Sequence, residues 1–247
     1  MTSSSRPWLS VVIPIKDERE NLVPLTQQLL KVLSARDESR SAPFEIIYID
    51  DGSTDGSGPL LDQLAEQHAE VIVLHFDRNY GQTSAFDAGF RQAQGDLVAT
   101  MDGDLQFDPA DLAKLLPLVR QYDLVCGWRK DRHDSLIRKL SSRIAYKVRD
   151  LVTHDGIHDT GCSLKVFRRA VVERMPPFEG MHRFFPALAQ MYGFTVTEVP
   201  VAHFPRIHGQ SKYGLGNRLF KGLYDLAAVR WMKSRCLRYR FRPGDRR

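Results

Sequence analysis

The first apolar run of the chain is Leu9-Ser10-Val11-Val12-Ile13, a pattern that predicts a buried strand. Apolar residues then recur at helical spacing, at Leu22, Leu25, Leu29 and Val32. A second apolar run follows at Phe44-Glu45-Ile46-Ile47-Tyr48-Ile49. A strand, a helix and a strand in this order predict a crossover connection between two parallel strands. The beginning of the chain therefore predicts an α/β fold.

The same alternation continues beyond residue 49. We expect further strands at 71–76, 97–101 and 123–126, with helices around 60–65, at 84–93 and from about Pro109. Asp17, three residues before Glu20, is expected to cap the first helix. In the less regular second half, the pattern favours helices at 134–149 and 181–191, an extended segment at 158–167 and a strand at 195–199. The expected architecture is a single, mostly parallel central sheet flanked by helices.

Composition excludes several classes of protein. The chain has 247 residues, of which 43% are hydrophobic, so it can bury a sizeable core. Its three cysteines lie far apart, which argues against a disulfide scaffold or a structural zinc site. The polar residues 1–7, expected to be disordered, lack the apolar core of a signal peptide, and no apolar run approaches the roughly 18 residues of a spanning helix. We therefore expect a protein of the cytoplasm.

The charge is concentrated at the C-terminal end. The net charge is +5, yet residues 215–247 alone contain ten Lys and Arg against two Asp. We expect an amphipathic helix at 215–238 with aromatic residues beside its apolar face, followed by a basic tail at 239–247. Such a helix suits the bilayer interface better than nucleic acid. A helix packed on the rest of the chain is the alternative.

Acidic residues directly follow three of the expected strands. They are Asp17-Glu18, Asp50-Asp51 and Asp102-Gly103-Asp104. In an open parallel sheet, ligands bind at the carboxyl ends of the strands. Carboxylates gathered there repel one another and lose hydration unless a cation or hydrogen-bond donors satisfy them. Each group alone could be an ordinary turn, but three at equivalent positions indicate a binding site.

The segment Asp102-Gly103-Asp104-Leu105-Gln106 gives the sharpest chemical signal. It provides two carboxylates and an amide, the oxygen ligands that a hard divalent cation prefers. Magnesium completes its coordination with water and phosphate oxygens, so the segment predicts a diphosphate ligand. No Gly-x-Gly-x-x-Gly follows Ile13, which argues against a dinucleotide-dependent dehydrogenase.

Together, several motifs resemble the family-2 inverting glycosyltransferases with the GT-A fold. They are Val-Val-Ile-Pro-x-x-x-Glu at 11–18, Ile-Asp-Asp-Gly-Ser-x-Asp at 49–55, Arg-Asn-x-Gly at 78–81 and Asp-x-Asp-x-Gln at 102–106. Three later motifs resemble the polyprenyl-phosphate sugar transferases, which include dolichol-phosphate mannose synthases and bacterial undecaprenyl-phosphate enzymes. These are Cys-Gly-Trp-Arg at 126–129, Asp-Thr-Gly-Cys-Ser-Leu-Lys-Val-Phe-Arg-Arg at 159–169 and Pro-Arg-x-x-Gly-x-Ser-Lys-Tyr-Gly at 205–214. The resemblance runs from about residue 8 to residue 232, and the glycosyltransferase domain is expected at 8–214.

The resemblance implies a role for each matching residue. The nucleotide pocket would be lined by Pro14, Lys16 and Glu18, with Ile49 and Asp51 at the base and ribose. Gly103 would let the backbone approach the diphosphate, and the metal would be held by Asp102, Asp104 and Gln106. Phosphate groups would be bound by Arg129, Arg206 and Lys212, and Asp159 could border the acceptor site or merely cap a turn.

The resemblance also implies an activity. We expect a metal-dependent transfer, with Mg²⁺ or Mn²⁺, of a sugar from a nucleotide donor to polyprenyl phosphate, with inversion. GDP-mannose is the favoured donor and UDP-sugars are close behind. The protein would lie on the inner face of the membrane as a peripheral enzyme, with a separate membrane subunit as a possible partner and no nucleic acid. Two alternatives are a glycosyltransferase with a glycan or small-molecule acceptor, and a non-catalytic nucleotide-sugar-binding subunit.

Overall fold

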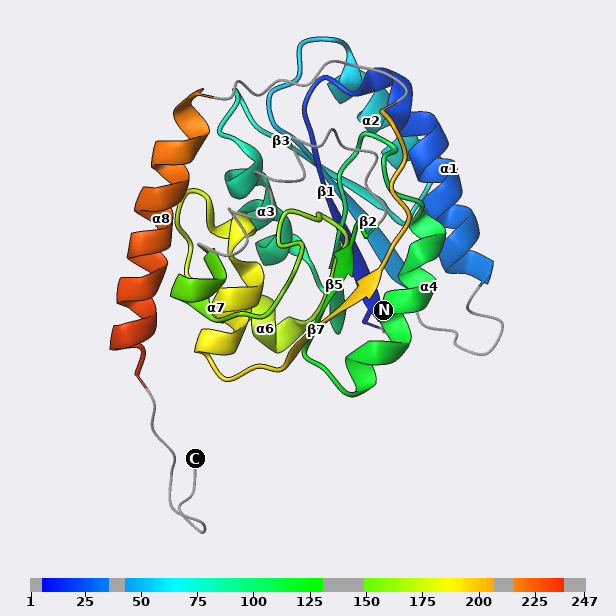
Figure 1. Ribbon diagram of the computed structural model, residues 1–247. Coiled ribbons are helices and arrows are strands. Elements are labelled where there is room, and N and C mark those ends of the chain that lie inside the picture. The colour runs from blue at the N-terminus through cyan, green and yellow to red at the C-terminus, as the bar shows by residue number, and fades with distance from the viewer. Residues whose placement is uncertain (1–5, 36–42, 131–148, 207–215, 238–247) are drawn as a thin grey trace, which may run out of the picture.

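The described part of the computed structural model, residues 6–35, 43–130, 149–206 and 216–237, contains one sheet of seven strands (Figure 1). The strand order is β3-β2-β1-β4-β6-β5-β7. The bounds are β1 Leu9–Ile15, β2 Phe44–Asp50, β3 Val71–His75, β4 Leu97–Thr100, β5 Leu124–Trp128, β6 Lys165–Arg168 and β7 Val196–Pro200. The expected apolar runs therefore all form strands of this sheet.

The sheet is mostly parallel, as expected. Strand β1 pairs in parallel with β2 and β4, β2 with β3, and β5 with β7. The exception is β6, which lies antiparallel between β4 and β5. Of the segment 158–167 that was expected to be extended, only the part from Lys165 onward joins the sheet. Thr100 of β4 lies directly opposite Lys165 of β6, and this register matters for the pocket.

Helices cover both faces of the sheet (Figure 1). One face carries α1 (Arg19–Ala35), α2 (Ser57–Gln67) and a segment made of η1 (Pro109–Asp111), α4 (Leu112–Leu115) and η2 (Leu116–Arg120). The other carries α3 (Gln82–Gln92), α6 (Arg169–Glu173), η3 (Met181–Arg183), α7 (Phe185–Met191) and α8 (Gly216–Arg235). Each face has its own cluster of buried apolar side chains. The expected arrangement of helices around a central sheet is thus confirmed.

The predicted cap of the first helix is wrong. Helix α1 begins at Arg19, so Glu18 rather than Asp17 directly precedes it. Asp17 adopts a left-handed φ of 49°, and its Oδ1 accepts a hydrogen bond of 2.7 Å from Thr54 N. The loop after β2 also receives a hydrogen bond from the start of the helix, because Arg19 N donates to Asp55 Oδ2 at 3.1 Å. The loops after β1 and β2 therefore hold each other at one edge of the sheet.

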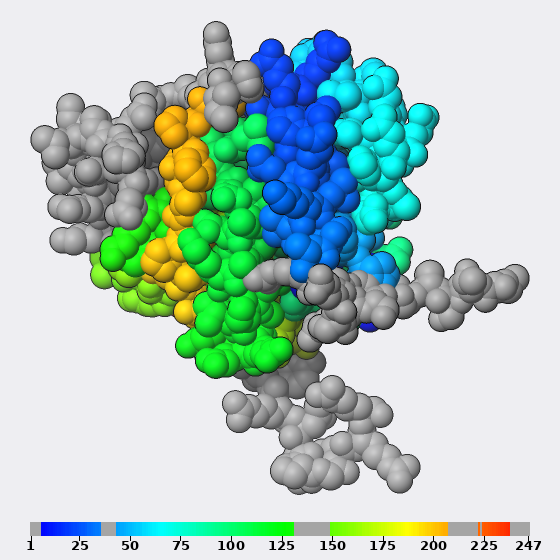
Figure 2. All heavy atoms as spheres, turned by 90° about the vertical axis from the view of Figure 1, so that its right-hand side faces the viewer, coloured from blue at the N-terminus to red at the C-terminus, as the bar shows by residue number. Residues whose placement is uncertain are grey.

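The described C-terminal part of the chain contributes helix α8 on one side of the protein and the segment after β7 on the other (Figure 1). Helix α8 buries Leu226 and Val229 against the body of the protein. Figure 2 shows the segment after β7, in orange, running beside α4 and α1, and Ala202 N donates to Asp111 Oδ2 at 2.6 Å there. The expected helix at 134–149, the N-terminus at 1–5 and the basic tail from 238 lie outside the described residues. Within the described ranges, none of the helices is long and apolar enough to cross a membrane.

We predict that one histidine makes stability depend on pH near neutrality. His75 Nδ1 lies 3.1 Å from Asp50 Oδ2, and its Nε2 lies 2.9 Å from Asp62 Oδ1. Burial lowers the pKa of His75, but the hydrogen bonds to the two carboxylates outweigh that effect and raise it. Because the folded pKa is above the unfolded value, the stabilisation is present below about pH 6.5 and is lost as pH rises through the folded pKa.

The variant His75→Gln should therefore lose more stability at pH 5.5 than at pH 8.5 when both are measured by urea unfolding. We expect a difference between the two pH values below about 1 kcal/mol, since the imidazole is partly exposed and solvent screens the pair. An equal loss at both pH values would contradict the assignment.

Candidate functional site

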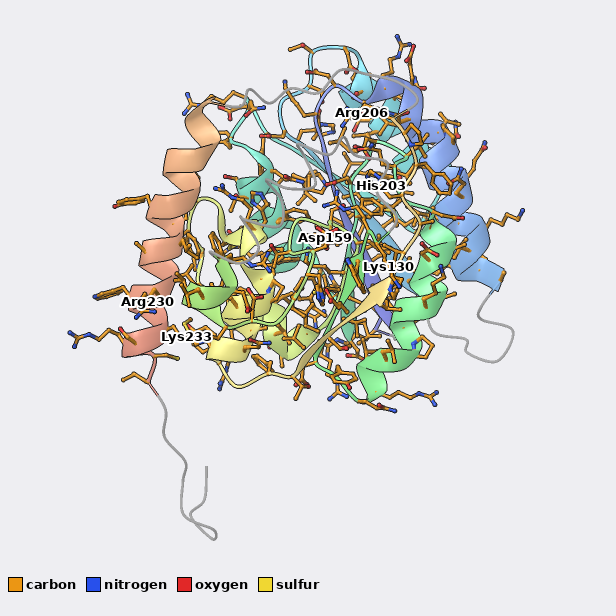
Figure 3. The ribbon with its side chains drawn as sticks, viewed as in Figure 1. Lys130, Asp159, His203, Arg206, Arg230 and Lys233 are labelled. Carbon is orange, nitrogen blue, oxygen red and sulfur yellow. The ribbon has the colours of Figure 1, made fainter. Side chains whose placement is uncertain are left out.

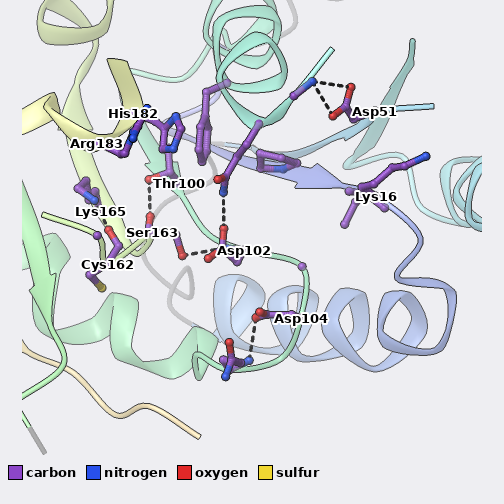
Figure 4. Close-up of a pocket in the computed structure, with 18 of the residues that line it drawn as sticks. Lys16, Asp51, Thr100, Asp102, Asp104, Cys162, Ser163, Lys165, His182 and Arg183 are labelled. Carbon is purple, nitrogen blue, oxygen red and sulfur yellow. Dashed lines mark hydrogen bonds between the residues drawn. The ribbon is translucent and has the colours of Figure 1, made fainter. Parts of the chain in front are cut away.

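A pocket of about 650 Å³ opens at the carboxyl edge of the sheet. The segments that follow β1, β2 and β4 meet there, joined by the beginning of α3, the loop 160–165, η3 and the segment that ends at Arg206. Figure 4 shows Lys16 and Asp51 at one end of the pocket, Lys165, Ser163, His182 and Arg183 at the other, and Asp102 between them. The carboxylates that the sequence places after separate strands are thus gathered in one cavity.

Most of the predicted site residues line this pocket. They are Pro14, Lys16, Glu18, Asp51, Asp102, Gly103, Asp104, Gln106 and Arg206. Ile49 does not follow the prediction, because its side chain is fully buried in the core cluster beneath α3. Lys212 lies outside the described residues.

Asp51 organises the loop that precedes α3. Its Oδ1 accepts a hydrogen bond of 2.6 Å from Tyr80 N, and its Oδ2 accepts one of 2.9 Å from Gly81 N. Burial raises the pKa of this carboxyl, and the two backbone donors oppose the rise. Beside it, Lys16 Nζ donates to the carbonyl oxygen of Gly52. This end of the pocket therefore has a fixed backbone and a fixed cation.

Asp102 is the carboxylate most strongly affected by its surroundings. Its Oδ1 accepts a hydrogen bond of 2.9 Å from Gln82 Nε2, and its backbone N–H donates to Ser163 Oγ at 3.2 Å. Burial, with the nearby charge of Asp104, raises its pKa to about 6. The charge of Asp104 therefore disfavours the ionised form of Asp102, and a bound cation would relieve this effect.

Asp104 and Glu18 share a guanidinium. Arg206 donates from Nη2 to Asp104 Oδ2 at 2.8 Å and from Nη1 to Glu18 Oε1 at 3.0 Å. This double ion pair joins the segments after β1, β4 and β7. The predicted phosphate-binding group thus lies in the pocket already paired with two acids.

The turn after β4 is strained and tightly packed. Leu105 has a φ of 57°, a left-handed conformation that non-glycine residues rarely adopt and that costs on the order of 1–3 kcal/mol. A Cβ at Gly103 would lie 2.3 Å from Ile15 Cδ1, so the end of the Ile15 side chain would have to move to admit any other residue. Gly103 thus packs closely against β1 and also lines the pocket.

The donor set fits a divalent cation only in part. Asp102 and Asp104 supply carboxylates, whereas Gln106 uses its amide Nε2 to donate to Phe204 O at 3.2 Å. Among the described residues, no group of three or more His, Cys, Asp or Glu side chains could hold a metal ion. Two carboxylates nevertheless match the way magnesium and manganese bind beside phosphate oxygens, which complete the coordination shell.

The predicted phosphate-binding group of Arg129 is engaged elsewhere. Arg129 donates from Nε to Asp159 Oδ2 at 2.7 Å and from Nη2 to Asp159 Oδ1 at 2.8 Å, and both side chains are largely buried. Within the described ranges, neither residue belongs to the pocket lining. Figure 3 shows Asp159 below Arg206, over the central part of the sheet. The pair instead fixes the base of the loop 160–163, which does line the pocket.

Several pocket residues were not expected from the sequence. Arg183 lines the pocket and donates to Asp225 Oδ2 of α8 at 2.8 Å. His182 shares a hydrogen bond of 2.7 Å with Thr83 of α3. Lys165 is buried at the opposite end from Asp51. A lysine inside the apolar run of a strand was the available signal for this last residue.

Comparisons with known proteins point to one family. Residues 10–175 match the family model described as glycosyl transferase family 2. The chain is 37% identical over 244 residues to a dodecaprenyl-phosphate galacturonate synthase of Rhizobium johnstonii, covering 96% of this chain and 69% of that protein. It is 40% identical over 220 residues to an undecaprenyl-phosphate 4-deoxy-4-formamido-L-arabinose transferase of Serratia proteamaculans, covering 88% and 66%. The chain thus spans about two thirds of the length of these relatives.

Solved structures agree on the fold. A glucosyl-3-phosphoglycerate synthase of Mycobacterium tuberculosis with UDP superposes with a TM-score of 0.63 at 14% identity, covering 94% of this chain and 82% of that one. A mannosyltransferase of Pyrobaculum calidifontis with GDP-Man and Mn²⁺ gives a TM-score of 0.58 at 18% identity, covering 93% and 63%. These likenesses support the expected GT-A type of fold. The two sequence relatives carry sugars other than mannose in their names.

We predict that the Arg129–Asp159 pair is a large contributor to stability. Removing one partner leaves the other charge buried, so Arg129→Met and Asp159→Asn should each lower the free energy of unfolding by about 3–5 kcal/mol. Urea unfolding of both single variants and the double variant would measure the coupling between them. The matched control is Arg91→Gln, which removes the exposed pair with Asp87 and should cost far less stability than either change in the buried pair. Equal effects of Arg129→Met and Arg91→Gln would contradict this account.

Proposed function

The chain belongs to glycosyl transferase family 2, and from this membership we propose that it transfers one sugar from a nucleoside-diphosphate donor to polyprenyl phosphate. The observation that carries the proposal is the pair of the partly buried Asp102 and the buried Asp104 in a pocket that also holds Lys16 and Arg206. Such a pocket suits a diphosphate bound through a divalent cation. The names of the sequence relatives support the polyprenyl-phosphate acceptor.

The relatives also guide the choice of sugar. Galacturonate and 4-deoxy-4-formamido-L-arabinose appear in their names, whereas mannose does not. We therefore place UDP-galacturonate and the nucleotide-linked amino pentose first among the donors, and keep GDP-mannose as a further candidate because a mannosyltransferase shares the fold.

The proposed reaction is a single displacement. An oxygen of the lipid monophosphate forms a bond to the anomeric carbon while the bond from that carbon to the donor diphosphate breaks, and the configuration inverts. The second pKa of a phosphate monoester is about 6, so the acceptor is already ionised near neutral pH and needs no dedicated base. A divalent cation held by Asp102 and Asp104 would stabilise the charge of the departing diphosphate.

The protein's own groups would position the reactants. The Asp51 end, with its ordered Tyr80 and Gly81 amides, would receive the nucleoside. Arg206 would exchange part of its contact with Asp104 and Glu18 for the diphosphate, to which a guanidinium can donate two parallel hydrogen bonds. In this scheme the sugar and the acceptor phosphate lie toward Ser163 and Lys165.

We further propose that α8 rests on the cytoplasmic face of a membrane. The apolar side of the helix faces the protein, while Tyr224 and Trp231 are 78% and 64% exposed. Arg230 lies on the same helix and is exposed (Figure 3). Aromatic and basic groups on one exposed helix suit the headgroup region of anionic lipid. A separate membrane subunit would be an additional attachment in the same region.

The transfer itself is tested with purified protein, Mn²⁺ or Mg²⁺, a panel of nucleotide sugars and short-chain polyprenyl phosphate. We expect mass spectrometry to detect one glycosyl-phosphate lipid, and Asp104→Asn to reduce its rate of formation by about 100-fold or more, because a group that stabilises charge in the transition state is lost. The matched control, Asp87→Asn on the exposed face of α3, should retain activity. Nucleotide release with a glycan or small-molecule product instead would favour a different acceptor, and nucleotide binding without turnover would favour a non-catalytic subunit.

Membrane attachment is tested by co-sedimentation with anionic vesicles. The double variant Tyr224→Ala, Trp231→Ala should bind several-fold more weakly than wild type, because two interfacial aromatic anchors are removed. Val23→Ala, at a partly exposed apolar position of α1, is the control and should bind like wild type. Unchanged binding of the double variant would contradict the proposed orientation.

A further inference from the structure

A buried lysine at the far end of the pocket has no counter-charge of its own. Lys165 is 2% exposed, lines the pocket, and donates from Nζ to the carbonyl oxygens of Thr160, at 3.1 Å, and Cys162. Within the described ranges it forms no ion pair with a carboxylate. An ammonium group has three donors, so the two carbonyl oxygens leave one donor for a further acceptor.

The other cations around the pocket differ in this respect. Arg129 is paired with Asp159, Arg206 with Glu18 and Asp104, and Arg183 with Asp225. Burying an ammonium without an ion-pair partner carries a large desolvation penalty. Such a residue in a cavity wall is therefore suited to an anion that arrives with a ligand.

The register of the sheet directs this lysine toward the reaction centre. Lys165 of β6 lies directly opposite Thr100 of β4, and both line the pocket. Side chains directly opposite each other on neighbouring strands share a face of the sheet. Asp102 follows Thr100 by two residues and also lines the pocket. Lys165 and Asp102 therefore border the same cavity (Figure 4).

Polar groups surround the space beside Lys165. Ser163 Oγ accepts from Asp102 N, while Thr160 and Gly161 contribute to the same wall. His182 and Arg183 face this end of the pocket as well (Figure 4). Lys16 and Asp51 lie at the opposite end, where the nucleoside is proposed to bind.

We propose that Lys165 forms an oxyanion subsite, separate from the diphosphate site, that binds a substrate anion beyond the donor diphosphate. The inference rests on the proposed function for the orientation of the donor. The anion is a phosphate monoester or a carboxylate: it belongs either to the lipid acceptor or to a uronic acid on the donor. Both present oxygen atoms with negative charge, which a point cation such as lysine recognises without demanding a planar partner.

The test compares Lys165→Gln and Lys165→Arg by calorimetric titration in the presence of Mn²⁺. The probes are UDP, geranyl phosphate added to the UDP-bound protein, and the donor pair UDP-galacturonate and UDP-galactose. Glutamine retains donors for the two carbonyl oxygens and removes the charge, whereas arginine keeps the charge. The matched control is Lys114→Gln, which removes an exposed lysine that pairs only locally with Asp111.

We expect Lys165→Gln to bind UDP within about two-fold of wild type and to lose about 10- to 100-fold in affinity for the oxyanion probe, the size of one charge-assisted hydrogen bond. Loss confined to geranyl phosphate assigns the subsite to the acceptor. Loss of the preference for UDP-galacturonate over UDP-galactose assigns it to the donor sugar. Lys165→Arg should retain most of the affinity, and Lys114→Gln all of it.

Two results would overturn the subsite. One is a folded Lys165→Gln that binds both oxyanion probes as wild type does; the other is an equal loss for UDP and for the oxyanions, which indicates a purely structural lysine. If the variants fail to fold, the wild-type protein supplies the readout, because the ¹⁵Nζ resonance of Lys165 should shift on titration with one of the oxyanion probes and stay unchanged if no subsite exists. These titrations need no turnover, so a failure of the transfer assay is distinguishable from a failure of the subsite.

Discussion

The mutual repulsion of the carboxylates at one edge of the sheet is the constraint on which the other contacts of the pocket depend. Parallel strands bring Glu18, Asp51, Asp102 and Asp104 into one partly dehydrated cavity, where they repel each other. The chain compensates some of them internally, through the amides of the loop before α3 and through Arg206. Asp102 is compensated least, and its pKa is raised to about 6. We propose that a cation brought by a diphosphate completes the balance.

Several segments of the chain contribute charged or polar contacts that hold these carboxylates in place. The segment after β7 carries Arg206 back across the sheet edge to the beginning of α1. The Arg129–Asp159 pair supports the loop that presents Ser163 to Asp102 N. Segments far apart in sequence thus converge on a small number of charged contacts.

The pocket is also joined to the helix that we propose meets the membrane. Arg183 belongs to the pocket lining and pairs with Asp225 of α8. Gly180 has a φ of 90°, and a Cβ there would lie 2.5 Å from Arg183 Nη2, so this turn permits the pair to form. The wall proposed to face the acceptor and the surface proposed to face lipid are therefore parts of one packed unit.

The sequence predicted the strands because apolar runs can be read from the local sequence. It also predicted the edge where the acids meet, because the carboxyl ends of parallel strands lie at the same edge of a sheet. It could not predict which cation pairs with which acid. Arg129 and Asp159 are brought together by β5 and the loop before β6, and Lys165 reaches the pocket only because β6 runs antiparallel beside β4. The prediction that Asp17 caps the first helix was wrong because Thr54, in the loop after β2, donates a hydrogen bond to its carboxylate. Tertiary register, rather than local pattern, decides these contacts.

The most direct test of the central claim is the affinity of the wild-type protein for UDP and GDP, measured by calorimetry with Mn²⁺ and with EDTA. If the carboxylates of Asp102 and Asp104 await a cation held jointly with a diphosphate, at least one nucleotide will bind tightly with Mn²⁺ and at least ten-fold more weakly with EDTA. Equal affinity under both conditions would contradict the account, because the diphosphate would then bind without the cation that these carboxylates require.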